Sequence, residues 1–155
     1  MASSATPSDS SAPPSDLAEL AGKGETTEEL IACKIGGCRK TTPLLSEEDV
    51  QKRMAVLPAW TLTGSVIERQ FTARHWQAAM DFLNAASTIA EAENHHPDLH
   101  LTGWRNVTVQ LSTHAAGGLT LGDFVLAAKL DTVEVDYSPK WLKEQAATKD
   151  GRGAQ

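Results

Sequence analysis

The chain has 155 residues, with 14 Lys and Arg against 20 Asp and Glu and a formal net charge of −6 at pH 7. This length allows one domain of ordinary size plus tails. The acidic balance excludes a basic surface for direct nucleic-acid binding or for attraction to an anionic membrane. No apolar run approaches the roughly 20 residues that span a bilayer, so we expect no membrane insertion.

Residues 1–44 form the expected N-terminal extension, disordered or loosely ordered. The first 25 residues are mostly Ala, Ser, Pro, Thr, Asp and Glu. Such residues bury too little apolar surface to offset an ordering entropy of about 1–2 kcal/mol per residue. The segment lacks the features of a secretory signal and is acidic where transit peptides are Arg-rich. We expect a cytoplasmic protein, with an organelle or the nucleus as the alternative.

Cys33 and Cys38 are the only cysteines, too few for a disulfide framework or a four-thiolate metal site. The segment between them could hold a metal or close a small loop, but no second thiol or imidazole pair lies nearby in the sequence. We interpret it as an ordered, non-catalytic lead-in.

The domain proper, residues 45–145, is predicted to begin with a helix. Ser46 followed three residues later by Asp49 is typical of an N-cap, and Pro58 ends the helix. Residues 60–63 and 66–71 alternate apolar with polar around Gly64. This alternation predicts a β-hairpin with one buried face.

Residues 73–94 are rich in Ala, with apolar side chains at three- and four-residue steps, and they predict a long helix with one apolar face. Pro97 disfavours helical geometry at His96, so the helix should end near His95. Alternation over residues 99–113 predicts a second hairpin that turns between positions 103 and 106.

A last helix of the domain is expected to follow this hairpin. Gly117-Gly118 interrupts the strand, and Thr120 with Asp123 resembles a capping box for a helix that ends near Leu130. Further on, Tyr137, Trp141 and their neighbours predict a final helical turn, and residues 146–155 a frayed C-terminal tail. The element order α-β-β-α-β-β-α predicts an α+β fold, a four-stranded antiparallel sheet with helices packed on one face.

Four of the five histidines fall between His95 and His114. Imidazole, with an unperturbed pKa of about 6.5, both gives and takes a proton near neutrality. A single histidine would be interpreted as an exposed residue with satisfied hydrogen bonds. Three histidines, His95, His96 and His114, at the ends of regular elements instead predict a proton-transfer site. Asp123 has two interpretations as well, as a cap for Thr120 or as the group that orients an imidazole.

A zinc site is the rival interpretation, with its ligands among His95, His96, His100 and His114. Adjacent histidines diverge on extended chain, and no pair four residues apart lies on one helix. The cysteine pair of the zinc deaminases is absent too. The spacing therefore argues against a metal, and His75 is interpreted as structural or exposed.

Three motifs carry a resemblance: Glu91-x-x-x-His-His-Pro97, then Ser112-Thr-His114, then Gly118-Leu-Thr-x-x-Asp-x-x-Leu-Ala127. Together they resemble the pterin-4a-carbinolamine dehydratase family, known also as dimerisation cofactor of a homeodomain transcription factor. The resemblance covers residues 45–130. It implies the same element order, removal of water from 4a-hydroxytetrahydropterin to give quinonoid dihydropterin, no metal or bound cofactor, and a homodimer or homotetramer.

Carried over position by position, the resemblance implies a set of site residues. The implied catalytic residues are His95, His96, His114 and Asp123, and the implied pterin-binding residues are Glu91, Asn94, Pro97, Ser112 and Thr113. We expect His96 and His114 to transfer protons while His95 binds or assists, with Asp123 and Glu91 tuning charge and orientation.

The competing hypothesis is a binding or adaptor protein that uses the same fold as a transcriptional cofactor for a partner protein. The intact histidine set favours the enzyme, because an adaptor has no need of it. Gly103-Trp104 departs from the pattern of many relatives, which bears on substrate preference more than on reaction type.

Overall fold

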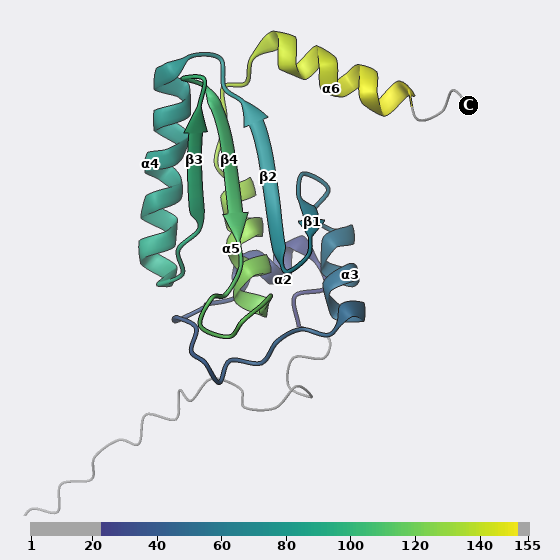
Figure 1. Cartoon of the computed structure of the whole chain (residues 1–155), viewed down its shortest axis with the longest axis vertical. Helices are drawn as coiled ribbons and strands as arrows, with labels where there is room; N and C mark the ends of the chain where they lie inside the picture. Colours follow the sequence, from purple (N-terminus) through teal and green to yellow (C-terminus); the bar gives the residue numbers. More distant parts are fainter. Residues whose placement is uncertain (1–22, 152–155) are drawn as a thin grey trace, which may run out of the picture.

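The computed structural model describes residues 23–151, so the expectations for residues 1–22 and 152–155 lie outside the described part. The elements in chain order are α2 (Thr27–Ala32), α3 (Glu47–Ala55), β1 (Thr61–Thr63), β2 (Val66–Thr72), α4 (Trp76–Glu93), β3 (Asp98–Thr102), β4 (Asn106–Leu111), α5 (Leu121–Asp131) and α6 (Pro139–Gly151) (Figure 1). From α3 to α5 this is the predicted order of the domain.

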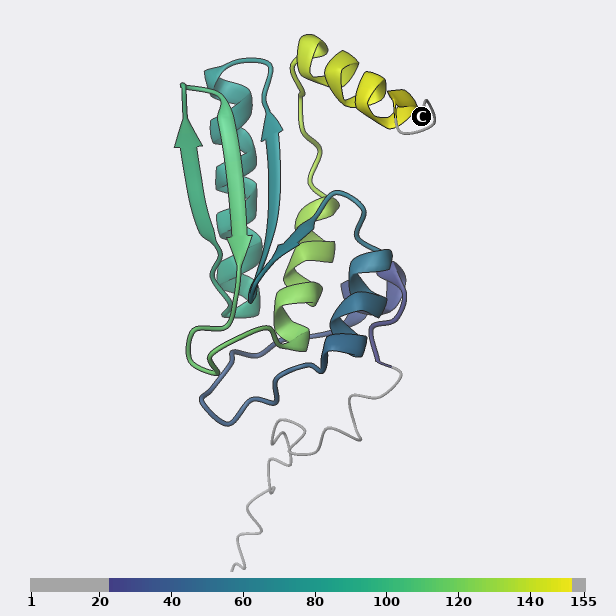
Figure 2. The ribbon, with the colours of Figure 1, turned by 45° about the vertical axis from the view of Figure 1, so that its right-hand side comes forward.

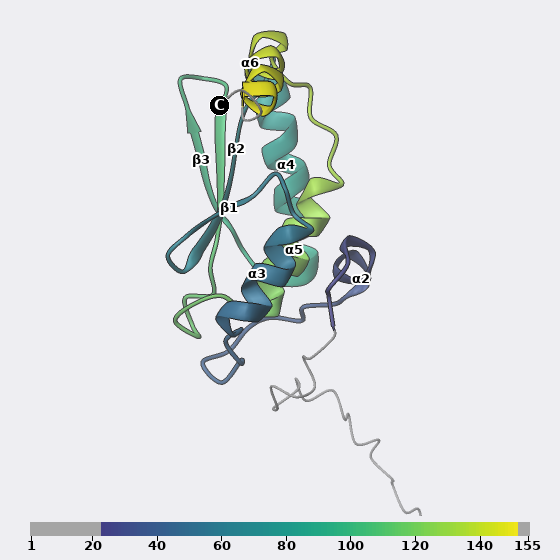
Figure 3. The same ribbon diagram turned by 90° about the vertical axis from the view of Figure 1, so that its right-hand side faces the viewer.

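The four strands form one antiparallel sheet in the order β1-β2-β4-β3. Helices α4 and α5 lie against the same face of this sheet, and α2 lies behind α5 (Figure 3). The predicted α+β fold with helices on one face is therefore confirmed.

The core lies between the sheet and the two central helices. Every second residue of β4 is buried, namely Val107, Val109 and Leu111, as expected for a strand with one covered face. The apolar face of α4 meets these strands, and the ring of Phe82 packs edge-on against Phe71 of β2 with centroids 4.9 Å apart. Each such buried side chain contributes about 1.5–3 kcal/mol of transfer free energy.

The ends of α4 decide where the site residues lie. The helix begins at Trp76, three residues later than predicted, because His75 Nδ1 accepts a hydrogen bond from the Ala78 amide at 3.1 Å and acts as the N-cap. It ends at Glu93, and Asn94 takes the left-handed conformation with φ 51°. The chain therefore turns away sharply at His95, close to the predicted end.

Residues 23–44 pack on the domain, which differs from the loose order expected for the extension. Leu30 of α2 is fully buried, and α2 contacts α5. Farther along, the Ile35 amide donates to Glu93 Oε2 at 3.0 Å, and the other carboxylate oxygen of Glu93 pairs with Lys129 of α5. These long-range contacts supply the ordering energy that the composition of the segment does not reveal.

Helix α6 is longer than the single turn expected, and residues 146–151 are helical where a frayed tail was expected. It extends away from the body of the domain (Figures 1 and 2). At its start Trp141 stacks on Tyr137 with ring centroids 5.2 Å apart. None of the helices within residues 23–151 is long and apolar enough to cross a membrane.

Candidate active site

The predicted site residues gather at one corner of the molecule. The C-terminal end of α4, the start of β3, the end of β4 and the start of α5 all lie at the same end of the sheet, the lower end in Figure 1. An antiparallel sheet produces this arrangement because β4 returns to the level at which β3 began. Residues far apart in sequence therefore meet here.

His95 and Asp123 form the buried centre of this corner. His95 Nε2 lies 2.7 Å from Asp123 Oδ1, and both side chains are almost fully enclosed. The second carboxylate oxygen of Asp123 accepts from the Thr113 hydroxyl at 2.8 Å and from the Thr120 amide at 2.9 Å. Asp123 thus fills both roles considered for it, capping the start of α5 and orienting an imidazole.

The surroundings of His95 favour its protonated form. Burial alone lowers the pKa of the imidazole, but the hydrogen bonds to Asp123 and to the Cys38 thiol, with the charges of these two groups, raise the pKa of His95 to about 9. At neutral pH His95 is therefore an imidazolium paired with the Asp123 carboxylate.

His96 points to the surface. Its Nε2 lies 2.5 Å from Oε1 of Glu91, one turn back on α4, and the side chain of His96 is 57% exposed. Glu91 is thus the carboxylate neighbour of this imidazole. An exposed imidazole with a carboxylate neighbour is accessible to a substrate as a proton donor or acceptor.

His114 lies just beyond β4 and is also exposed. Its Nε2 lies 3.6 Å from Oδ2 of Asp98, the first residue of β3. Asp98 was not among the predicted site residues, although its place directly after Pro97 was a signal for it. His100 points elsewhere, and its Nε2 lies 3.3 Å from Gln110 Oε1 on the neighbouring strand.

The predicted pterin-binding positions line the chain between these groups. Asn94 and Pro97 flank the histidine pair, and Ser112 directly follows β4. Thr113 is buried, its hydroxyl donates to Asp123, and its amide donates to the Gly118 carbonyl at 2.8 Å. The hydrogen-bond donors of Thr113 are therefore used within the protein.

Cys38 is a site neighbour that the sequence interpretation missed. Its thiol contacts the His95 imidazole and lies 3.7 Å from Thr120 Oγ1. Because Cys38 and His95 are 57 positions apart in the sequence, no sequence spacing signals this contact. Within residues 23–151, no group of three or more His, Cys, Asp and Glu side chains is arranged to hold a metal ion.

Comparison with known proteins identifies the family. The model of the family described as pterin 4 alpha carbinolamine dehydratase matches residues 43–133. A protein of Nitrosospira multiformis named putative pterin-4-alpha-carbinolamine dehydratase is 35% identical over 108 residues, which cover 70% of this chain and 95% of that protein. A protein of Chlorobaculum tepidum with the same name is 42% identical over 98 residues, 61% of this chain and 87% of the relative.

A longer relative and a solved structure agree with this match. Pterin-4-alpha-carbinolamine dehydratase 2, mitochondrial, of Arabidopsis thaliana is 35% identical over 115 residues, but the chain spans only 59% of its length. The crystal structure of a transcriptional coactivator/pterin dehydratase from Brucella melitensis superposes with a TM-score of 0.54 at 27% identity, over 57% of this chain and 96% of that one.

These similarities place the chain among the hydro-lyases, enzymes that remove water from a substrate, as the sequence predicted. It belongs to the pterin 4 alpha carbinolamine dehydratase family.

Proposed function

We propose that the chain removes water from 4a-hydroxytetrahydropterin to give quinonoid dihydropterin by histidine acid/base catalysis. The observation that carries this proposal is the pairing of three imidazoles with three carboxylates at one corner of the fold. The pairs are His95 with Asp123, His96 with Glu91, and His114 with Asp98.

The proposed chemistry needs two proton transfers. An acid protonates the leaving 4a-oxygen and a base takes a proton from a ring nitrogen, each for a gain of about 10²- to 10⁴-fold. We assign these transfers to His96 and His114, whose side chains are 57% and 82% exposed. A bulky substrate is able to reach both.

The buried pair has a different proposed role. The His95 side chain is only 7% exposed, and Asp123 is fully buried. We assign His95 to binding or assisting through its positive charge, and Asp123 to positioning His95. Thr113 contributes by holding Asp123, because the hydroxyl and the amide of Thr113 already donate to groups within the protein. Asn94, Pro97 and Ser112 provide the chain along which the pterin ring binds.

The test is the decay of freshly generated 4a-hydroxytetrahydropterin, followed by ultraviolet absorbance with and without the purified protein. We expect acceleration that survives added chelator and disappears in the His96→Ala, His114→Ala double variant. His100→Ala is the matched control, an exposed histidine that pairs with an amide. No acceleration by a folded protein would refute the proposal and favour the binding-protein alternative.

We also propose that the chain assembles as a homodimer or homotetramer. Strands β1 and β3 lie at the two edges of the sheet, and Trp76 and Trp104 are 52% and 54% exposed. Edge strands and exposed large apolar side chains are features that association covers. Sedimentation equilibrium of the full chain should give two or four times the chain mass, and a monomer at micromolar concentration would refute this assembly.

A further inference from the structure

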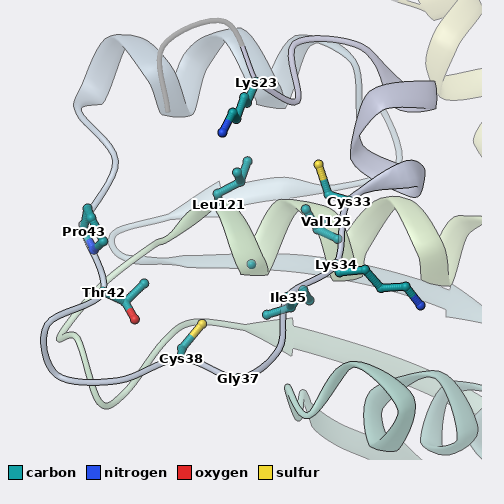
Figure 4. A pocket seen from close by; sticks show the side chains of 11 residues that line it. Lys23, Cys33, Lys34, Ile35, Gly37, Cys38, Thr42, Pro43, Leu121 and Val125 are labelled. Carbon is teal, nitrogen blue, oxygen red and sulfur yellow. The ribbon is translucent and has the colours of Figure 1, made fainter. Parts of the chain in front are cut away.

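The segment from Cys33 to Cys38 forms a small cavity behind the histidine site. This segment runs from the C-terminal end of α4 to the start of α5. The hydrogen bond from the Ile35 amide to Glu93 holds it against α4. The cavity has a volume of about 250 Å³. The side chains that line it include Lys23, Cys33, Lys34, Cys38, Leu121 and Val125 (Figure 4).

Cys38 connects this cavity to the buried ion pair. Its sulfur lies 3.7 Å from Thr120 Oγ1, and the Thr120 amide donates to the Asp123 carboxylate at 2.9 Å. The His95 imidazole, whose Nε2 lies 2.7 Å from the same carboxylate, also interacts with the Cys38 thiol. Gly122 makes room for the sulfur, since a Cβ at this position would lie 3.1 Å from Cys38 Sγ. Cysteine, imidazole and carboxylate therefore form one continuous chain, the arrangement in which an imidazole activates a thiol nucleophile.

Several charged groups act on the Cys38 thiol. Burial raises its pKa, but the hydrogen bond and the charge of His95, with the Thr120 hydroxyl, together bring the pKa of Cys38 below its ordinary value; the Asp123 carboxylate opposes them. Lys23 and Lys34 line the same cavity.

We propose that Cys38 is a nucleophilic modification site, at which a small hydroperoxide entering this cavity oxidises the thiolate to a sulfenic acid. The sulfur attacks the terminal oxygen of the hydroperoxide, so an S–O bond forms and the O–O bond breaks. Sulfur loses two electrons and the peroxide gains them. The leaving alkoxide or hydroxide takes the proton of the His95 imidazolium and departs as an alcohol or water.

The imidazolium is the reason to choose a hydroperoxide among electrophiles. Cleavage of the O–O bond expels a basic oxygen, and a proton donor beside the sulfur lowers the barrier to that step. His95 lies against the sulfur. An alkylating agent with a halide leaving group would make no use of this proton.

Cys33 provides a matched control within the same chain. Both cysteines are free, both are half-buried and both line the cavity. Figure 4 shows their sulfur atoms at separate ends of it, with Cys33 near Val125 and Lys34 and Cys38 near Gly37. A difference in reactivity between the two thiols therefore reflects the interaction of Cys38 with His95 and not a difference in solvent accessibility.

The experiment treats the full chain with hydrogen peroxide, traps sulfenic acid with dimedone and locates the adduct by peptide mass spectrometry. We expect the adduct at Cys38 and not at Cys33. With iodoacetamide as a thiolate probe at pH 7, we expect Cys38 to react about tenfold faster than Cys33, and His95→Gln to abolish this difference.

Equal labelling of the two cysteines in the wild-type chain would overturn the proposal, as would a dimedone adduct that persists in Cys38→Ser. If His95→Gln does not fold, the pH profile of iodoacetamide labelling in the wild-type chain decides instead. A Cys38 profile that coincides with that of Cys33 would again overturn it. These measurements use no pterin, so their outcome is independent of whether the chain has dehydratase activity.

Discussion

His95 Nε2 lies 2.7 Å from Asp123 Oδ1 in a buried pair that joins the end of α4 to the start of α5. The Thr113 hydroxyl, just beyond β4, donates to the same carboxylate. One carboxylate therefore ties three elements together at the point where the exposed histidines emerge. The stability of the fold and the geometry of the proposed site depend on the same contact.

The first prediction concerns stability and pH. The pKa of His95 is about 9 in the folded protein and about 6.5 in an unfolded chain. Because the folded value is the higher one, the pair contributes its full stability below pH 6.5 and loses it as the pH rises through about 9, a change of about 3 kcal/mol. Urea unfolding of the wild type and of His95→Gln between pH 6 and 9.5 should show this loss in the wild type alone. Parallel pH dependences would contradict it, and a Cys38→Ser background removes the titration of the thiol.

The second prediction concerns His96. Replacement by Ala should lower the rate of pterin dehydration at least about tenfold, because an exposed proton-transfer group is lost. The free energy of unfolding should change by less than about 0.5 kcal/mol, as for most surface substitutions. The absorbance assay and thermal unfolding measure the two quantities. An unchanged rate would remove His96 from the mechanism, and His100→Ala should leave both quantities unaltered.

The third prediction concerns Thr113. Thr113→Val keeps the shape of the side chain but leaves Asp123 without one of its hydrogen bonds, which should cost about 1–3 kcal/mol of unfolding free energy. The pH-dependent stability assigned to His95 should change as well, because Asp123 is then less firmly held. Thr102→Val, at an exposed position of β3, is the control. If both variants unfold at the same urea concentration, Asp123 does not depend on Thr113.

The fourth prediction concerns the extension. Leu30 is fully buried on α5, whereas its neighbour Ile31 is 38% exposed. Leu30→Ala should therefore destabilise the protein by about 2–5 kcal/mol, and Ile31→Ala by much less. Denaturant unfolding of both variants tests whether residues 23–44 belong to the cooperative unit. Equal and small effects would show that the domain folds without them.

Local patterns predicted most of the fold from α3 to α5. Ser46 accepts a hydrogen bond from the Asp49 amide at 3.2 Å, as its capping pattern indicated. The alternation in residues 107–111 placed one face of β4 in the core. Such features depend on residues within a few positions of one another, and their periods are visible in the sequence.

The element order, the histidine motifs and with them the family could also be predicted without a structure, because each follows from local residue patterns. The groups that face each histidine could be identified only once the packed fold was known. Asp123 meets His95 across 28 positions, Asp98 rather than Asp123 meets His114, and Cys38 reaches His95 from the extension. The partner of each histidine depends on which ends of the sheet and helices come together. The packing of α2 depends on the burial of Leu30. Contacts of this kind depend on the closure of the whole chain around its core, and no local period encodes them.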